Sequence, residues 1–118
     1  MKIKFYSYTP SGNVKFESEG IYNGNTLSFI DKSYQNTTIN IEINPNNIHF
    51  NRVGECNMDM HLEIGKKCIG YYKTKDLSFD FIAEAHDILI NDKKIALNYE
   101  LFINNQAYGI YKIFIVLK

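Results

Sequence analysis

Excess charge of either sign is absent from this chain of 118 residues. Its 13 lysine and arginine residues balance 13 aspartate and glutamate residues, so the formal net charge is +0. A nucleic-acid binder needs surplus cations to displace phosphate counterions. A polybasic membrane patch needs a longer basic run than the pairs Lys66-Lys67 and Lys93-Lys94. We therefore expect neither a nucleic-acid partner nor a membrane partner.

Long apolar runs are also missing. The longest, Ile113 to Leu117, is far shorter than the roughly 20 residues that a membrane-spanning helix requires. The first residues lack the apolar stretch of a secretory signal. Only two cysteines occur, Cys56 and Cys68, and without such a signal they predict free thiols in a reducing compartment. The expectation is a cytoplasmic protein without disulfides.

Helical periodicity is nearly absent, whereas apolar residues recur at every second position through most of the chain. The clearest run contains Cys56, Met58, Met60, Leu62 and Ile64. Turns rich in Asn, Gly and Pro separate about nine or ten such runs, with no crossover helix between them. The last run, Ala107 to Leu117, is apolar on both faces, as in a strand that is covered on both sides or closes a sheet. The pattern predicts one all-β domain over residues 1–118, an antiparallel barrel or sandwich.

The single arginine, Arg52, lies on the apolar side of the run Ile48 to Gly54, a position that should face the core. Turn chemistry fixes the strand pairing around it. The turn Asn44–Asn47 sets Ile43 opposite Ile48 and Ile39 opposite Arg52, and paired residues share a face.

The Asn23-Gly24 turn gives a second hairpin with one charged residue on its inner face. It sets Tyr22 opposite Asn25 and Phe16 opposite Asp31.

Arg52 and Asp31 are therefore candidates for an ion pair. If the strand of Asp31 pairs with that of Ile39, the two charged residues lie on either side of Ile39. Their strands are then about 9.6 Å apart at roughly 4.8 Å per strand, within reach of an extended arginine. A buried charge persists only when it is paired. We predict an Arg52–Asp31 pair inside the barrel or at its mouth.

Five short motifs, in order and spaced over most of the chain, resemble the YwiB-like family. They are Ser18-Glu19-Gly20, Leu27-Ser28-Phe29-Ile30-Asp31, Arg52-Val53-Gly54, Tyr72-Lys73-Thr74 and Leu97-Asn98-Tyr99-Glu100-Leu101. Asp31 stands where the family usually has Glu, and the glycine expected soon after Tyr72-Lys73-Thr74 is missing. The resemblance implies a bacterial domain of unknown function with a calycin-like, or lipocalin-like, up-and-down β-barrel of about 8–10 strands and little or no helix. It supplies no catalytic residues.

Other reactive side chains give weaker patterns. Asp59, His61 and Glu63 project from one face of a strand, but alternate residues are about 6.6 Å apart and need a neighbouring strand to converge on one ion. We expect no metal site there, and we place His49 and His86 at the surface. No nucleophile motif or phosphate loop is present. The chain is not expected to be an enzyme or to need a cofactor.

Two functions remain open. In the first, the barrel binds one small ligand, as eight-stranded barrels can, and Arg52 favours an anionic group. The candidate lining residues are Arg52, Asp31, Phe50, Met58, Tyr72 and Tyr99. In the alternative, the interior is filled, the ion pair is structural, and the protein acts through its surface or a sheet edge. A cavity beside Arg52 favours the first function, and a packed interior favours the second.

Overall fold

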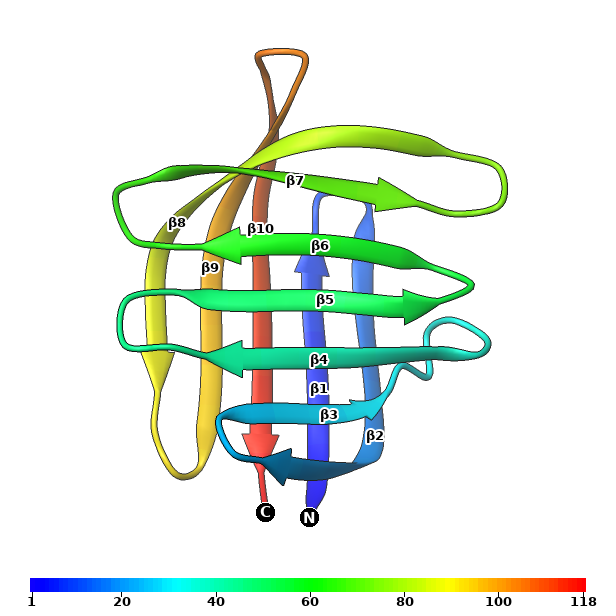
Figure 1. Cartoon of the computed structure of the whole chain (residues 1–118), viewed down its shortest axis with the longest axis vertical. Helices are drawn as coiled ribbons and strands as arrows, with labels where there is room; N and C mark the ends of the chain where they lie inside the picture. The colour runs from blue at the N-terminus through cyan, green and yellow to red at the C-terminus, as the bar shows by residue number, and fades with distance from the viewer.

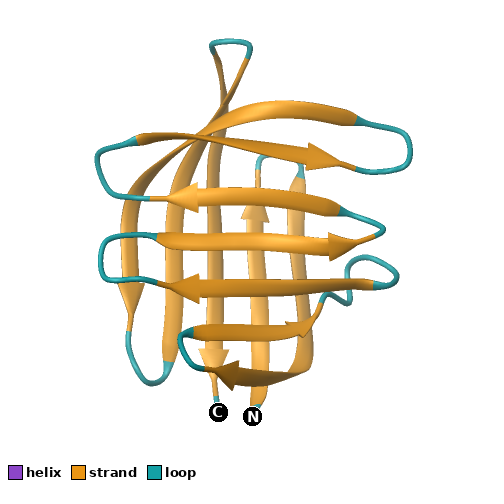
Figure 2. Ribbon diagram, viewed as in Figure 1, coloured by secondary structure: helices purple, strands orange, loops and turns teal.

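The protein is a closed barrel of ten antiparallel strands, seen in a computed structural model that describes all residues 1–118 (Figure 1). The strands are β1 (Lys2–Thr9), β2 (Gly12–Asn23), β3 (Thr26–Ile30), β4 (Thr37–Ile43), β5 (Ile48–Gly54), β6 (Asn57–Leu62), β7 (Lys67–Lys73), β8 (Ser78–Ile90), β9 (Lys94–Ile103) and β10 (Gln106–Leu117). Every regular element is a strand (Figure 2). No helix is long and apolar enough to cross a membrane. The predicted all-β, up-and-down barrel is confirmed.

The last strand closes the barrel, which is one of the two roles that its apolar residues predicted. β10 pairs with β9 on one side and with β1 on the other, where Phe5 lies opposite Ile115. Each remaining strand pairs with its neighbours in sequence. The ring therefore has no free sheet edge, which removes the unpaired backbone groups that promote edge-to-edge aggregation.

The barrel is flattened into two layers whose strands cross. β3 to β7 run across the front in Figure 1, and β1, β2, β8, β9 and β10 run behind them along the long axis. β2 and β8 are among the longest strands and bend from one layer into the other. Crossed layers of this kind enclose a core formed by the inward residues of both sheets.

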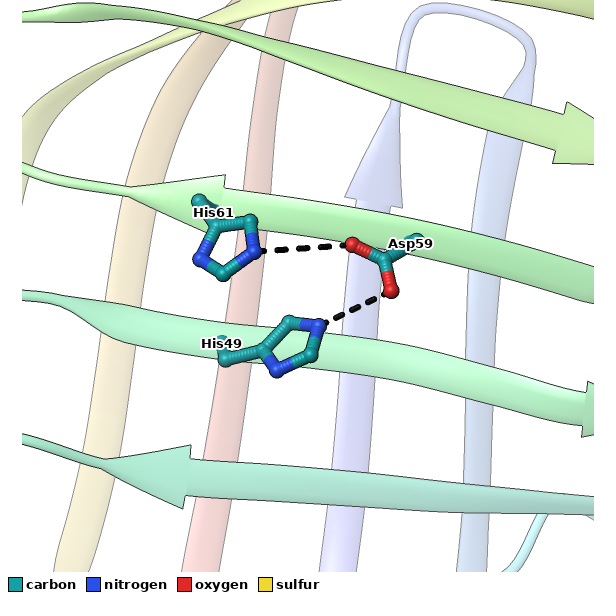
Figure 3. Close-up of side chains that lie close together, drawn as sticks. All are labelled: His49, Asp59 and His61. Atoms are coloured by element: carbon teal, nitrogen blue, oxygen red, sulfur yellow. Dashed lines mark hydrogen bonds and ion pairs between the residues drawn. The ribbon is translucent and has the colours of Figure 1, made fainter.

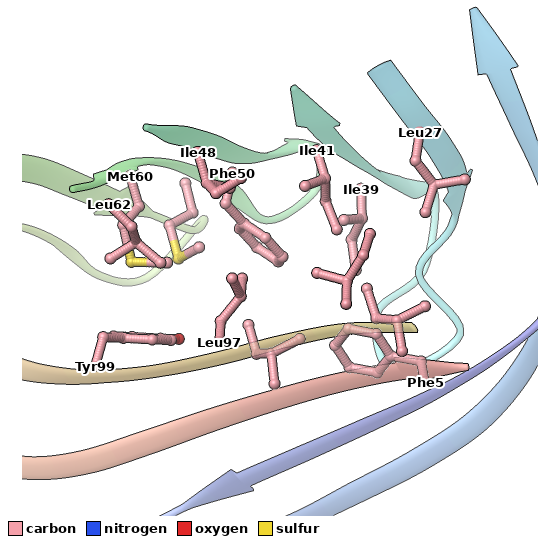
Figure 4. Close-up of a cluster of buried hydrophobic side chains, with 14 of the residues drawn as sticks. Phe5, Leu27, Ile39, Ile41, Ile48, Phe50, Met60, Leu62, Leu97 and Tyr99 are labelled. Carbon is pink, nitrogen blue, oxygen red and sulfur yellow. The ribbon is translucent and has the colours of Figure 1, made fainter. Parts of the chain in front are cut away.

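That core is a cluster of 20 buried hydrophobic residues, and Figure 4 shows part of it. Phe5, Leu27, Ile41 and Phe50 are among those with no exposed surface. The predicted alternation holds through most of the barrel and fails at some positions near the strand ends. Ile64, grouped with the inward residues of its run, is 54% exposed because β6 ends at Leu62.

The hairpin around Asn44–Asn47 has the predicted register, with Ile43 opposite Ile48 and Ile39 opposite Arg52. A backbone hydrogen bond closes this turn, since the Asn44 amide nitrogen donates to the carbonyl of Asn47 at 3.0 Å. A proline at the second position of the connection fits such a turn.

The predicted register of the first hairpin was wrong. Its turn is centred on Gly24 and Asn25, so Tyr22 lies opposite Leu27 instead of Asn25. Only Gly24 of these two has a positive φ, 65°, which matches a turn needing glycine at its first central position. The shift moves each partner by two residues, so every side chain stays on its predicted face. Phe16 pairs with Phe5 and does not lie opposite Asp31.

Candidate functional site

The predicted ion pair is present at one end of the barrel. Nε of Arg52 donates to Oδ2 of Asp31 at 2.9 Å. The Asp31 side chain has no exposed surface, and that of Arg52 is 16% exposed. Asp31 follows β3 directly and its amide nitrogen donates to the carbonyl of Thr37, so it lies beside Thr37 and not beside Ile39 as expected. The pair therefore runs diagonally across the start of β4.

The second oxygen of Asp31 is held by a residue that the sequence reasoning missed. Oδ1 accepts hydrogen bonds from the backbone amide of Ser33, at 2.9 Å, and from the Ser33 hydroxyl. An aspartate bonded to the amide two residues ahead is an Asx-turn, and the sequence Asp31-Lys32-Ser33 at a strand end is a recognisable signal for one. Both oxygens of the buried carboxylate are thus satisfied.

The outer edge of the guanidinium of Arg52 has no carboxylate partner. Nη1 lies 3.7 Å from Sδ of Met58, a weak acceptor, and Asp31 is the one acidic residue in ion-pair contact with Arg52. The carbon atom of the guanidinium lies 5.4 Å from the centre of the Phe50 ring. Arg presents five donors in a planar fork, and Asp31 and Met58 are the only protein partners of that fork in this structure.

Tyrosines complete this end of the barrel. Tyr72 lies opposite Met58 on β7, and Tyr99 of β9 is buried. The Tyr72 hydroxyl lies 2.7 Å from that of Tyr34, which belongs to the connection between β3 and β4. Because β4, β5 and β6 separate that connection from β7 in the sheet, this contact spans the strand ends where Arg52 and Met58 lie. We refer to residues 32–36 as the cover loop.

The six predicted site residues therefore gather at one place on the inner face. Phe50 and Asp31 have no exposed surface, Met58 and Tyr99 are buried, and Arg52 and Tyr72 are partly exposed. Cys56, expected to be a small core residue, is also fully buried here, and its amide nitrogen donates to the Thr37 hydroxyl at 3.3 Å. Both cysteines are free thiols, as predicted.

Alkaline pH should destabilise the protein through these tyrosines. Burial raises the pKa of Tyr99 and of Tyr72 above the ordinary value, and for Tyr72 the contact with Tyr34 raises the pKa further. The folded state therefore favours the neutral phenols. Their contribution to stability is complete below the pKa of an unfolded tyrosine, about 10, and is lost as pH rises above it.

We expect a spectrophotometric titration to show some of the nine tyrosines ionising only as circular dichroism reports unfolding. Tyr99→Phe should move the onset of unfolding to higher pH, because one phenol that must ionise is gone. Reversible ionisation of every tyrosine near pH 10 in a folded protein would contradict this prediction.

The centre of the barrel is filled by the hydrophobic cluster. The five main hollows on the molecule are open to solvent, and none is lined by any of the six site residues. One hollow, of about 510 Å³, lies next to the site in sequence and is lined by Glu55, Asn57, Lys73, Thr74 and Lys75. The packed centre is what the filled-barrel alternative requires.

The three histidines lie on the outside, as expected. His86 and Glu100 are 3.3 Å apart on neighbouring strands. Glu63 does not join Asp59 and His61, and instead pairs with Lys66 at 2.7 Å. The structure places His49 beside Asp59 and His61 in its stead (Figure 3).

Comparison with known proteins gives a family and a fold. No curated protein matches the chain. The crystal structure of the YwiB protein from Bacillus subtilis is similar with a TM-score of 0.65 at 10% identity, over 99% of this chain and 89% of that one. At this identity the likeness shows the fold alone, and it supports the expected YwiB-like, calycin-like barrel. A family model described as a domain of unknown function, DUF1934, matches residues 7–115. The chain thus belongs to the DUF1934 family.

Proposed function

We propose that the barrel binds a small anion, a carboxylate or phosphate group, through the outer edge of the Arg52 guanidinium. The observation that carries this proposal is the one-sided pairing of Arg52. Asp31 holds Nε, and only a thioether sulfur faces Nη1. An arginine whose position is fixed by one carboxylate and whose fork is open fits a second, planar anion well.

The filled centre limits where a ligand can lie. It leaves no room for a long apolar molecule along the axis, so the proposed ligand sits at the barrel end beneath the cover loop. Two hydrogen bonds near the surface hold this loop against the later strands, Tyr34 to Tyr72 at 2.7 Å and Asn36 to Glu55 at 3.3 Å. Each bond of this kind contributes only about 0.5–1.5 kcal/mol, so these two contacts oppose an outward movement of Tyr34 and Asn36 only weakly, while Ser33 keeps its bonds to Asp31.

The test is a titration of the untagged protein with inorganic phosphate and with short carboxylates, followed by thermal melting. A ligand at 100 times its Kd should stabilise the folded state by about 2.7 kcal/mol. We expect Arg52→Lys, which keeps the charge beside Asp31 but loses the fork, to weaken binding at least about 10-fold.

Lys75→Ala is the matched control. It removes a cation from the neighbouring open hollow and should leave the affinity unchanged. Equal affinities in the parent and Arg52→Lys, or loss of binding in Lys75→Ala alone, would place the anion on the surface and refute the proposal.

The second candidate is a structural or protein-interaction role with a filled interior. It is favoured by the packed hydrophobic cluster and by the fact that none of the main hollows is lined by Arg52. Native mass spectrometry of protein purified from cells separates the two. A co-purifying small molecule that is lost on denaturation, and is absent from Arg52→Lys, supports anion binding. A parent mass equal to that of the bare chain, together with no stabilisation by the anions, supports the filled barrel. The proposed activity is binding, and it involves no catalytic residue.

A further inference from the structure

Three metal-ligating side chains gather on the outer face of β5 and β6 (Figure 3). Nε2 of His49 lies 2.9 Å from Oδ2 of Asp59, and Nε2 of His61 lies 3.6 Å from the other oxygen, Oδ1. One potential ligand atom from each of the three residues lies within 4.8 Å of the others. The two imidazoles thus converge on opposite oxygens of a single carboxylate.

The strand pairing explains why they converge. His49 and His61 are directly opposite each other on β5 and β6, and Asp59 precedes His61 by two residues. Alternate residues on one strand are too far apart to share an ion, but a residue on the neighbouring strand closes the triangle. The two rings stack with centroids 4.1 Å apart and an interplanar angle of 8°.

The strands that carry these side chains are well packed. β5 pairs with β4 and with β6, and β6 pairs with β5 at both Asp59 and His61. The inward residues that alternate with the cluster, Ile48, Phe50, Met60 and Leu62, are at most 2% exposed. A site built on packed central strands is held closer to its binding geometry than one on loops.

We propose that His49, Asp59 and His61 bind one divalent first-row transition metal, of which Zn²⁺ is the representative. Two imidazole nitrogens and one carboxylate oxygen suit Zn²⁺, Co²⁺, Ni²⁺ or Cu²⁺, whereas Mg²⁺ and Ca²⁺ prefer oxygen ligands alone. Ligand bonds of about 2.0–2.2 Å require the rings to tilt out of their stack toward the carboxylate. Three protein ligands leave a coordination position open to water.

This site is independent of the anion site at Arg52. The two occupy opposite faces of the same layer, since Arg52 alternates with His49 along β5 and points inward. The proposed site also differs from the set considered in the sequence, Asp59, His61 and Glu63, for which no metal was expected. That set needed a ligand from a neighbouring strand, and His49 on β5 can supply it.

A second cluster provides a matched comparison. Glu84, His86 and Glu100 also bring three possible ligand atoms within 4.8 Å of one another, on the outer face of β8 and β9. It contains one imidazole where the first cluster has two. Because imidazole nitrogens favour transition metals over hard cations, the His86 cluster should bind Zn²⁺ more weakly.

The experiment is a titration of untagged, metal-free protein with Zn²⁺ in competition with a chromogenic chelator, repeated with Co²⁺ to record visible absorption from direct coordination. We expect one equivalent to bind to the parent protein. His49→Gln and His61→Gln should each weaken Zn²⁺ binding at least about 10-fold and abolish the Co²⁺ absorption bands. His86→Gln and Cys68→Ser should retain both properties, and Mg²⁺ should not compete.

Melting temperatures keep the result interpretable, because both histidines lie at the surface and each Gln variant should fold like the parent. If one histidine variant fails to fold, the other and Asp59→Asn carry the test. Absence of stoichiometric Zn²⁺ binding in the parent would mean that the cluster is only a hydrogen-bonded group, and would overturn the proposal. Retained binding in folded His61→Gln, or loss of binding in Cys68→Ser or His86→Gln, would overturn it equally.

Discussion

Arg52→Ala is expected to lower the free energy of unfolding by about 3–5 kcal/mol, because it leaves a buried carboxylate without its cation. Asp31 has no exposed surface, and Arg52 is its one cationic partner. The two hydrogen bonds from Ser33 remain in the variant, but they do not neutralise the charge. Urea denaturation at neutral pH measures the effect as a lower midpoint.

A surface ion pair provides the control. Lys4 and Glu17 are 3.8 Å apart, and their side chains are 32% and 50% exposed. Lys4→Ala should change stability by no more than about 1 kcal/mol. In a double-mutant cycle, adding Asp31→Asn to Arg52→Ala should recover part of the loss, since the stranded charge is removed. If Arg52→Ala unfolds at the same urea concentration as the parent, Asp31 reaches water and the pair is superficial.

The pair could be predicted because it depends mainly on the face that each residue takes, which alternation and the Asn44–Asn47 turn indicate. Alternation placed Arg52 on the inner face, and the Asn44–Asn47 turn fixed its partner as Ile39, both of which the structure confirms. The first hairpin turned at Gly24-Asn25 and not at Asn23-Gly24, yet the face of Asp31 did not change. Moving the turn by one residue shifts each cross-strand partner by two residues, so the same residues still point inward.

What escaped prediction depends on features that alternation does not encode. The cover loop reaches Tyr72 through Tyr34, and its path includes Asn36 with a φ of 48°. Such backbone choices are set by tertiary packing. The pairing of His49 with His61 was accessible in principle, because the short turn between β5 and β6 fixes their register. Counting across that third hairpin would have found it.

Gly54→Ala is expected to destabilise the fold by an amount on the order of 2–6 kcal/mol, combining backbone strain with a steric clash. Gly54 has a φ of +144°, a conformation that residues with a side chain rarely adopt. A Cβ at this position would lie 1.9 Å from the carbonyl oxygen of Asn36 and 2.8 Å from Cα of Thr37. These are backbone atoms, so no side-chain rotation relieves the contact.

The clash would also disturb the candidate site. Gly54 is paired with Thr37, whose carbonyl accepts from the Asp31 amide and whose hydroxyl accepts from the Cys56 amide. Moving Thr37 outward therefore displaces the carboxylate that holds Arg52. The structure therefore explains both end residues of the Arg52-Val53-Gly54 motif. Arg52 is needed to pair with Asp31, and Gly54 is needed because the backbone of Asn36 and Thr37 lies too close for a side chain.

Gly12→Ala separates the two contributions to that cost. Gly12 has almost the same φ, +146°, but a Cβ there meets no atom within 4 Å. It should show the strain alone, about 1–3 kcal/mol, and the difference between the two variants measures the clash with Asn36 and Thr37. Thermal and urea unfolding of both proteins under one buffer give that difference. Equal losses in the two variants would mean that the cover loop yields freely to the new methyl group, and that Gly54 does not fix its position.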